Sequence, residues 1–168
     1  TLVLMQKTHI DDWSLYARTM SIDNGQAVVE VEGKVVNAGK DVVANVELIA
    51  PDGEKASADT RIEADGKFYT TFTVNNPKLW SPETPYLYKV RAKVQKIGSV
   101  GPEHHVLLDS KEFNTGIRTI RVSRENGFQL NGVTRKLKGV CLHHDLGPLG
   151  AAINKTALIR QIQMLKAM

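Results

Sequence analysis

Apolar and polar residues alternate along much of the chain, and the alternation predicts a series of short β-strands. The clearest runs are residues 29–35, 44–48 and 88–94, where every second residue is apolar or small. Because successive side chains of a strand point to opposite faces, a period of two indicates strands with one face in a core and the other in water. Turn signals separate these runs, at Asn24-Gly25, Pro51-Asp52-Gly53 and Asp65-Gly66.

Further strands complete the pattern of a β-sandwich. They are expected at residues 10–18, 68–74 and 106–113. A proline-rich crossover occupies residues 76–85. About seven short strands with turns between them are typical of an immunoglobulin-like antiparallel β-sandwich, which we assign to residues 1–115. The aromatic residues expected in its core are Trp13, Phe68 and Phe72.

The pattern changes after residue 115 and predicts the beginning of a second domain, residues 116–168. One strand is expected at residues 117–122, followed by a hairpin around Asn131-Gly132. The apolar run 138–142 reads as a strand buried on both faces, and the polar residues His143, His144 and Asp145 follow it. A helix is expected from about Asn154, with Asn154 or Thr156 as its N-cap and with Leu158, Ile162 and Leu165 on one apolar stripe. Strand, loop and helix form one βα unit, which we interpret as the first strand and helix of a truncated (β/α)8 barrel.

The charge of the chain is unevenly divided, which bears on its partners. Residues 1–115 carry 13 Lys and Arg against 16 Asp and Glu, a net of −3, and residues 116–168 carry 9 against 2, a net of +7, which together give +4. The basic residues are scattered without aromatic residues between them, so no nucleic-acid partner is expected. No apolar run approaches the ~20 residues that span a bilayer, so no membrane partner is expected either. The opening residues lack an initiator Met, which indicates a piece of a longer protein.

Three segments stand out by their order and spacing. Residues 76–88 read Asn-Pro-Lys-Leu-Trp-Ser-Pro-Glu-Thr-Pro-Tyr-Leu-Tyr, residues 113–120 read Phe-Asn-Thr-Gly-Ile-Arg-Thr-Ile, and residues 128–145 run from Phe-Gln-Leu-Asn-Gly to His-His-Asp. Together they resemble signatures of glycoside hydrolase family two, which contains β-galactosidases, β-glucuronidases and β-mannosidases. The ending His-His-Asp-Leu-Gly, where the family usually has His-Glu-Asp or His-Glu-His, is most similar to bacterial β-galactosidases. The resemblance implies a sugar-binding jelly-roll domain before this chain and most of a catalytic barrel after it.

Two residues of this chain, Asp145 and His143, are expected at the substrate-binding site. Asp145 matches the family position that contacts sugar hydroxyls, a role that suits a carboxylate because it accepts strong charge-assisted hydrogen bonds. His143 lies two residues earlier and shares a side with Asp145 if the strand continues, so it either lines the sugar pocket or orients Asp145. The alternatives are a turn-capping aspartate and a structural histidine in the barrel wall. A structural role is expected for His144.

No catalytic residue is expected within this chain. Family members hydrolyse β-glycosides with retention, using two glutamates, and this mechanism needs two carboxyl groups about 5–5.5 Å apart. No Glu lies in residues 126–168, where Asp145 is the one carboxylate side chain. The chain alone is therefore expected to be inactive. Its parent is expected to be a β-galactosidase, with β-glucuronidase or β-mannosidase as the alternatives, and to act in the bacterial cytoplasm or periplasm.

Other interpretations concern cofactors and binding. His143 and Asp145 are too few for a metal site, so no metal or cofactor is expected here, although the resemblance implies Mg²⁺ or Na⁺ in some parents. Trp80 is expected to wedge the crossover against the core rather than to stack on a sugar, and Arg118 to hold the sandwich to the barrel.

Two alternatives are left open by the pattern. A non-enzymatic carbohydrate-binding module would show an exposed aromatic row on one sheet face, whereas the outward positions here carry Lys, Glu and Thr. A lone apolar βα unit must also pack on something, and we expect it to dock on the sandwich or on a second copy of the chain, which would make a homo-oligomer.

Overall fold

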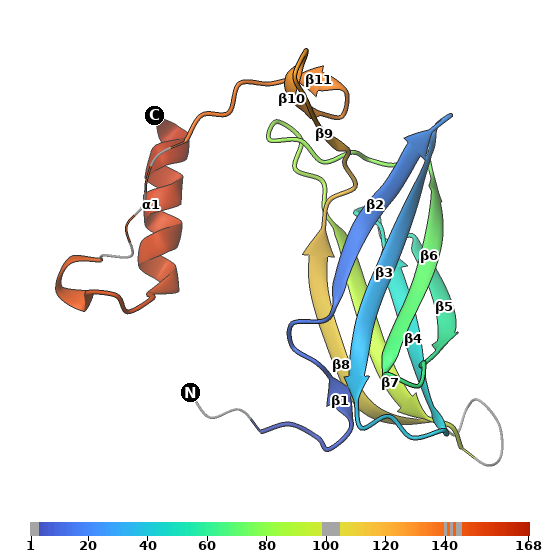
Figure 1. The fold of residues 1–168 in the computed structure, drawn as a ribbon. Helices are drawn as coiled ribbons and strands as arrows, with labels where there is room; N and C mark the ends of the chain where they lie inside the picture. The colour runs from blue at the N-terminus through green and yellow to red at the C-terminus, as the bar shows by residue number, and fades with distance from the viewer. Residues whose placement is uncertain (1–3, 99–104, 140, 142, 144–145) are drawn as a thin grey trace. The chain divides into compact units, whose positions relative to one another are not determined.

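The computed structural model describes residues 4–98, 105–139, 141, 143 and 146–168. Contacts divide the chain into two compact units, residues 1–135 and residues 136–168. Within the described residues, the first unit contains strands β1 to β11, and the second contains the short 3-10 helix η2 and the helix α1 (Figure 1).

The first sheet of the larger unit is antiparallel and is built around β3 (Gln26–Val36). Strands β2 (Tyr16–Asp23) and β6 (Lys67–Asn75) flank β3, and the short β1 (His9–Ile10) pairs with its C-terminal end. Asn24 and Gly25 join β2 to β3 with φ of 47° and 75°. These values suit the two-residue hairpin that Asn-Gly favours, so the predicted turn is confirmed.

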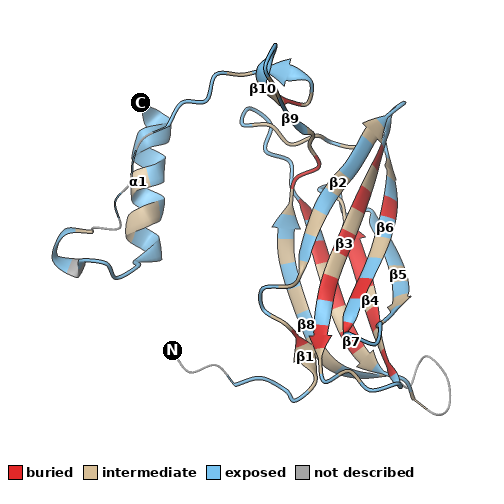
Figure 2. Ribbon diagram, viewed as in Figure 1, coloured by how far each residue is buried: buried red, intermediate tan, exposed pale blue. Residues whose placement is uncertain are grey.

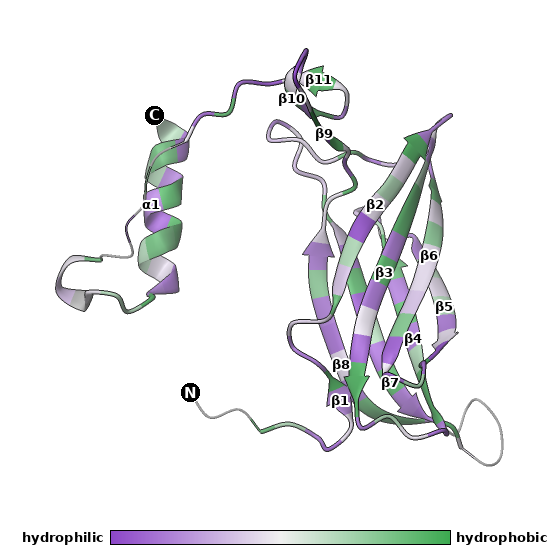
Figure 3. Cartoon of the chain, in the orientation of Figure 1, coloured by the Kyte–Doolittle hydropathy of each residue, from purple (hydrophilic) through white to green (hydrophobic). Residues whose placement is uncertain are grey.

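The second sheet is also antiparallel and has the order β5 (Lys55–Arg61), β4 (Val42–Ile49), β7 (Tyr88–Lys96) and β8 (Val106–Thr115). Hydropathy alternates most clearly along β3, β4 and β7 (Figure 3). The apolar residues of both sheets form one buried cluster, which includes Ile10, Val31, Phe68, Val46 and Val90 (Figure 2). The predicted mainly β architecture with antiparallel sheets is confirmed, and it is consistent with a sandwich.

The structure corrects the sequence prediction at the edges of the sheets. Trp13 was expected in the core, but its side chain is 94% exposed because residues 11–15 form a turn and a loop between β1 and β2. The single strand expected at residues 10–18 is therefore two short segments. Strand β5 had no predicted counterpart, because its sequence Lys-Ala-Ser-Ala-Asp-Thr-Arg alternates polar residues only with small ones and contains no large apolar residue. It pairs through its backbone at an edge, where polar side chains are common.

A small third sheet follows the second. Strands β9 (Ile120–Ser123), β10 (Gly127–Leu130) and β11 (Val133–Thr134) are antiparallel, and Asn131-Gly132 forms the predicted hairpin with φ of 52° and 77°. Contacts place this sheet in the larger unit, which extends to Arg135. Ile117 explains the attachment, since its side chain is fully buried in the sandwich core. The predicted boundary of a barrel domain after residue 115 stays a prediction.

The smaller unit contains η2 (Gly147–Leu149) and α1 (Lys155–Ala167). The Asn154 side chain accepts a hydrogen bond of 3.0 Å from the backbone N–H of Ala157, so the predicted N-cap is confirmed. No residue of α1 is buried, and Ile162 of the predicted stripe is 58% exposed. The described residues of the run 138–142, namely 138, 139 and 141, belong to no strand, so the beginning of a barrel is not confirmed. None of the helices in the described ranges is long and apolar enough to cross a membrane.

Candidate functional site

The two residues predicted to contact substrate lie in the smaller unit. Asp145 and the neighbouring His144 fall outside the described residues. His143 is exposed and lines a hollow of about 230 Å³ together with Leu146, Ile153, Leu158 and Gln161. This hollow is mostly apolar, and His143 is the titratable side chain among those that line it. The roles of His143 and Asp145 in substrate binding therefore stay predictions.

The described residues offer no evident metal centre. No group of three or more His, Cys, Asp or Glu side chains in this part of the chain is arranged to hold a metal ion. His104, His144 and Asp145 lie outside the described residues. The prediction that this chain binds no metal or cofactor is left as it stands.

A charged cluster that the alternation of residues does not predict lies on the outer face of the second sheet. Glu47 lies at the centre of β4, and its side chain is 5% exposed. One carboxylate oxygen accepts hydrogen bonds from Lys55 and Lys93, both at 3.0 Å, and the other accepts one from Arg91 at 3.1 Å. Burial raises the pKa of Glu47, but these bonds outweigh it and lower the pKa to about 2. Alternation along β4 shows only that Glu47 points outward. It cannot show that Lys55 of β5 and Arg91 and Lys93 of β7 cover Glu47, because these residues belong to other strands.

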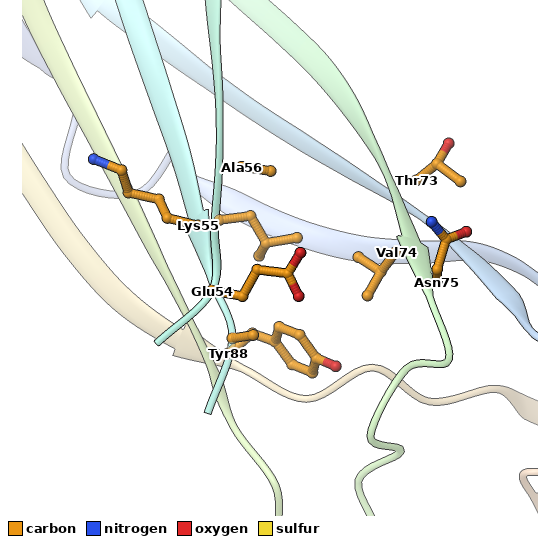
Figure 4. A pocket seen from close by; sticks show the side chains of 9 residues that line it. Glu54, Lys55, Ala56, Thr73, Val74, Asn75 and Tyr88 are labelled. Atoms are coloured by element: carbon orange, nitrogen blue, oxygen red, sulfur yellow. The ribbon is translucent and has the colours of Figure 1, made fainter. Parts of the chain in front are cut away.

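A second hollow of about 120 Å³ opens at the edges of the two sheets, between β5 and β6 (Figure 4). The Tyr88 and Glu54 side chains extend into it, whereas the Lys55 ammonium points away (Figure 4). The Tyr88 hydroxyl accepts a hydrogen bond of 2.9 Å from the backbone N–H of Lys78, so this phenol anchors the proline-rich crossover. The hollow has room for a few waters and contains no pair of groups suited to acid–base chemistry.

A further set of contacts in the larger unit surrounds Trp80, and we call it the junction cluster: Trp80, Gly116, Arg118 and Asn131. The Trp80 backbone N–H donates to the Ile117 carbonyl at 2.9 Å. The Arg118 guanidinium lies over the Trp80 ring, 5.0 Å from its centroid, which is a cation–π contact. Because the Arg118 guanidinium covers this face of the Trp80 ring, the face is not open to stack on a sugar. The contacts of Trp80 therefore favour the predicted structural role.

Asn131 connects three segments of the junction cluster. Its side-chain N–H donates to the Trp80 carbonyl at 3.0 Å, and its side-chain oxygen accepts from the Thr119 N–H at 3.0 Å. Its backbone N–H donates to the Thr119 carbonyl at 2.9 Å. The same residue therefore forms the β10–β11 turn and fixes that turn to the crossover. Sequence reasoning identified Asn131 only as a turn residue.

An ion pair lies close by, at the end of the larger unit. The Arg135 guanidinium binds both carboxylate oxygens of Glu83, at 2.6 and 2.9 Å. The hydrogen bond from Arg135 lowers the pKa of Glu83 to about 2. Two parallel hydrogen bonds fix the orientation of the Arg135 guanidinium relative to the Glu83 carboxylate. The pair therefore helps to orient the backbone at Arg135, where the larger unit ends.

Comparison with known proteins shows the family to which this chain belongs. The model of the family described as glycosyl hydrolases family 2 matches residues 8–118, about two thirds of the chain. The chain belongs to this family. The three segments that resemble the family in sequence contribute Trp80 from the first, Gly116 and Arg118 from the second and Asn131 from the third. In the structure they form one cluster within the larger unit.

Relatives within glycosyl hydrolases family 2 are much longer than this chain. The β-galactosidase BoGH2A of Bacteroides ovatus is 37% identical over 95% of this chain, which corresponds to 19% of that protein. A putative β-glucuronidase of Formosa agariphila is 35% identical over 99% of this chain and 16% of its own length. A crystal structure of a family 2 member from Bacteroides cellulosilyticus matches 97% of this chain and 23% of its own with a TM-score of 0.77 and 30% identity. This chain spans about a fifth of the curated relatives that it matches.

The junction cluster of this family 2 chain gives a testable prediction at Gly116. A Cβ atom added there would lie 2.6 Å from both Cβ and Cγ of Trp80, atoms too close to the backbone to move aside. We expect Gly116→Ala to lower the free energy of unfolding by about 1–3 kcal/mol. In a Trp13→Phe background, Trp80 is the sole tryptophan, so its fluorescence reports the disturbance during urea unfolding.

Gly139→Ala is the matched control for this experiment. No heavy atom lies within 4 Å of the Cβ that it would add. We expect it to change stability by less than about 0.5 kcal/mol. Equal unfolding curves for Gly116→Ala and Gly139→Ala would show that Trp80 does not pack on Gly116.

Proposed function

We propose that this chain is part of a retaining glycoside hydrolase that acts on β-galactosides. The observation that carries the proposal is the 37% identity to a β-galactosidase over 95% of the chain, a share too large to leave out residues 136–168. The sequence also supports a β-galactosidase, because the His-His-Asp sequence at residues 143–145 is the form most similar to bacterial β-galactosidases. A β-glucuronidase is the second candidate, supported by the putative β-glucuronidase that is 35% identical.

The larger unit acts in this proposal as an immunoglobulin-like spacer domain. Its two antiparallel sheets share one core, and the junction cluster fixes the backbone just before residues 136–168 begin. Those residues then form the first strand and helix of a (β/α)8 barrel. Apolar side chains that are exposed in this chain, such as Leu137, Ile162 and Leu165, are expected to be covered by later barrel elements.

Asp145 is proposed to bind hydroxyls of the sugar at the cleavage site, with His143 beside it. The two catalytic glutamates are proposed to come from later barrel strands, since residues 126–168 contain none. The proposed partner of the longer protein is a β-glycoside substrate. No nucleic-acid or membrane partner is proposed. Association of two copies and the metal content of the longer protein stay predictions.

Activity of the longer protein tests this proposal. We expect it to hydrolyse nitrophenyl β-galactoside, while the 168-residue chain hydrolyses neither this compound nor the β-glucuronide and β-mannoside. Asp145→Ala in the longer protein is expected to lower kcat/KM about 10–100-fold, the effect of losing one hydrogen bond to a charged group. Turnover of the β-glucuronide alone would show that the longer protein is a β-glucuronidase rather than a β-galactosidase. Turnover by the 168-residue chain would refute the proposal that the catalytic glutamates lie outside it.

A further inference from the structure

Two exposed tyrosines share the outer face of the first sheet. Tyr16 on β2 lies directly opposite Glu32 on β3, and Glu32 lies directly opposite Tyr69 on β6. Residues that pair across antiparallel strands point to the same face, so the three side chains form one row. Tyr16 is 42% exposed and Tyr69 is 54% exposed. This row contradicts the expectation that the outward positions carry only Lys, Glu and Thr.

The row borders an open hollow of about 330 Å³ lined by Tyr69 and charged side chains. Two of its carboxylates are neutralised: Glu30 pairs with Arg18 at 2.5 Å, and Asp65 pairs with Lys67 at 3.7 Å. The other two, Glu32 and Glu63, form no ion pair within the described ranges. Each accepts one hydrogen bond from a tyrosine hydroxyl, at 2.6 Å from Tyr16 and 2.7 Å from Tyr69.

The chemistry of this surface suits a sugar chain. An ionised carboxylate has about four acceptor positions, so Glu32 and Glu63 keep positions open for hydroxyl donors after binding one phenol each. The exposed tyrosine rings offer apolar faces for the C–H groups of sugar rings. Tyr16 and Tyr69 are two strands apart, which separates them by roughly 10 Å, comparable to the length of two linked hexoses. The hollow has four carboxylates against Arg18 and Lys67, a balance that repels acidic sugars.

We propose that the outer face formed by β2, β3 and β6 binds a neutral oligosaccharide of at least two linked hexoses, with Tyr16 and Tyr69 as stacking platforms and Glu32 and Glu63 as hydroxyl acceptors. The site lies on the larger unit, so it needs no residue of the segment that contains His143 and Asp145. The choice of ligand class rests on the proposed glycoside hydrolase function. The site would hold a polymeric substrate without taking part in its cleavage.

Binding of β-1,4-galactotetraose to the 168-residue chain tests this proposal, because the measurement needs no catalysis. We expect saturable amide shifts in NMR spectra that concentrate on residues 16–18, 30–32 and 67–71. Tyr16→Ala and Tyr69→Ala are each expected to weaken the affinity about tenfold, the scale of one aromatic contact. Trp13→Ala is the control, since Trp13 is 94% exposed and lies outside the row.

Several outcomes would overturn the proposal. Absence of saturable shifts with galactotetraose would do so, and so would equal weakening by Trp13→Ala, which would indicate non-specific contact with any aromatic residue. Tighter binding of tetragalacturonate than of galactotetraose would contradict the charge argument. Loss of binding on addition of EDTA would show that the carboxylates hold a cation instead. An inactive longer protein with a chain that binds galactotetraose would refute the proposed function and leave this site intact.

Discussion

Replacement of Phe68 by alanine is expected to destabilise the chain by about 3–5 kcal/mol, the usual cost of emptying a large buried site. Phe68 is fully buried in the core between the two sheets. It lies opposite Gly33 on β3, and a Cβ atom at Gly33 would collide with the Phe68 ring. The ring therefore fills space that Gly33 leaves empty, and no side chain at position 33 can relax into the cavity. The melting temperature should fall by about 10 °C, measured by circular dichroism.

Tyr69→Ala is the matched control, since Tyr69 is the next residue of β6 and points to the opposite, exposed face. Its removal should cost less than about 1 kcal/mol. The coupling with Gly33 sharpens the test. Gly33→Ala should be destabilising alone but tolerated together with Phe68→Ala, because the ring that it strikes is then absent. Additive effects of the two substitutions would contradict the assigned packing.

The parts of the fold that could be predicted from sequence are those fixed by local patterns. Alternation located β3, β4 and β7, and Asn-Gly pairs located two hairpins, because backbone geometry with positive φ favours these residues directly. Edge strands carry a weaker signal: one face of β5 has only the small residues Ala56, Ala58 and Thr60, and this strand was missed. Trp13 was misplaced because hydrophobicity alone cannot distinguish a core residue from an exposed loop residue.

The parts that could not be predicted depend on contacts between distant segments. The sequence indicates that Asn131 forms a turn, but its bond to Trp80 joins residues 51 positions apart. The Tyr16–Glu32–Tyr69 row requires the register of three strands, which alternation does not determine. The candidate sugar contacts were located by resemblance to a family, and that resemblance gives a role to Asp145 without its geometry.

Glu47→Gln is expected to remove much of the acid sensitivity of this chain. The pKa of Glu47 lies at about 2 in the folded chain, below its ordinary value of 4.5. A group with a depressed pKa stabilises the fold above its unfolded pKa, and this contribution is lost as the pH falls from about 4.5 to about 2. At neutral pH we expect Glu47→Gln to cost about 2–3 kcal/mol, because the amide cannot neutralise Lys55, Arg91 and Lys93.

The two urea-unfolding series, for the wild-type chain and Glu47→Gln, should therefore differ most at neutral pH and converge as the pH approaches 2. Glu112→Gln is the control within the same cluster. Glu112 also binds Arg91, and hydrogen bonding to Arg91 lowers its pKa, but its side chain is 41% exposed, so water screens its charge. Its loss should therefore change the free energy of unfolding much less than the loss of Glu47 does. If Glu47→Gln shifted stability by the same amount at every pH, the cost would come from packing, and the buried carboxylate would not be the source of the acid sensitivity.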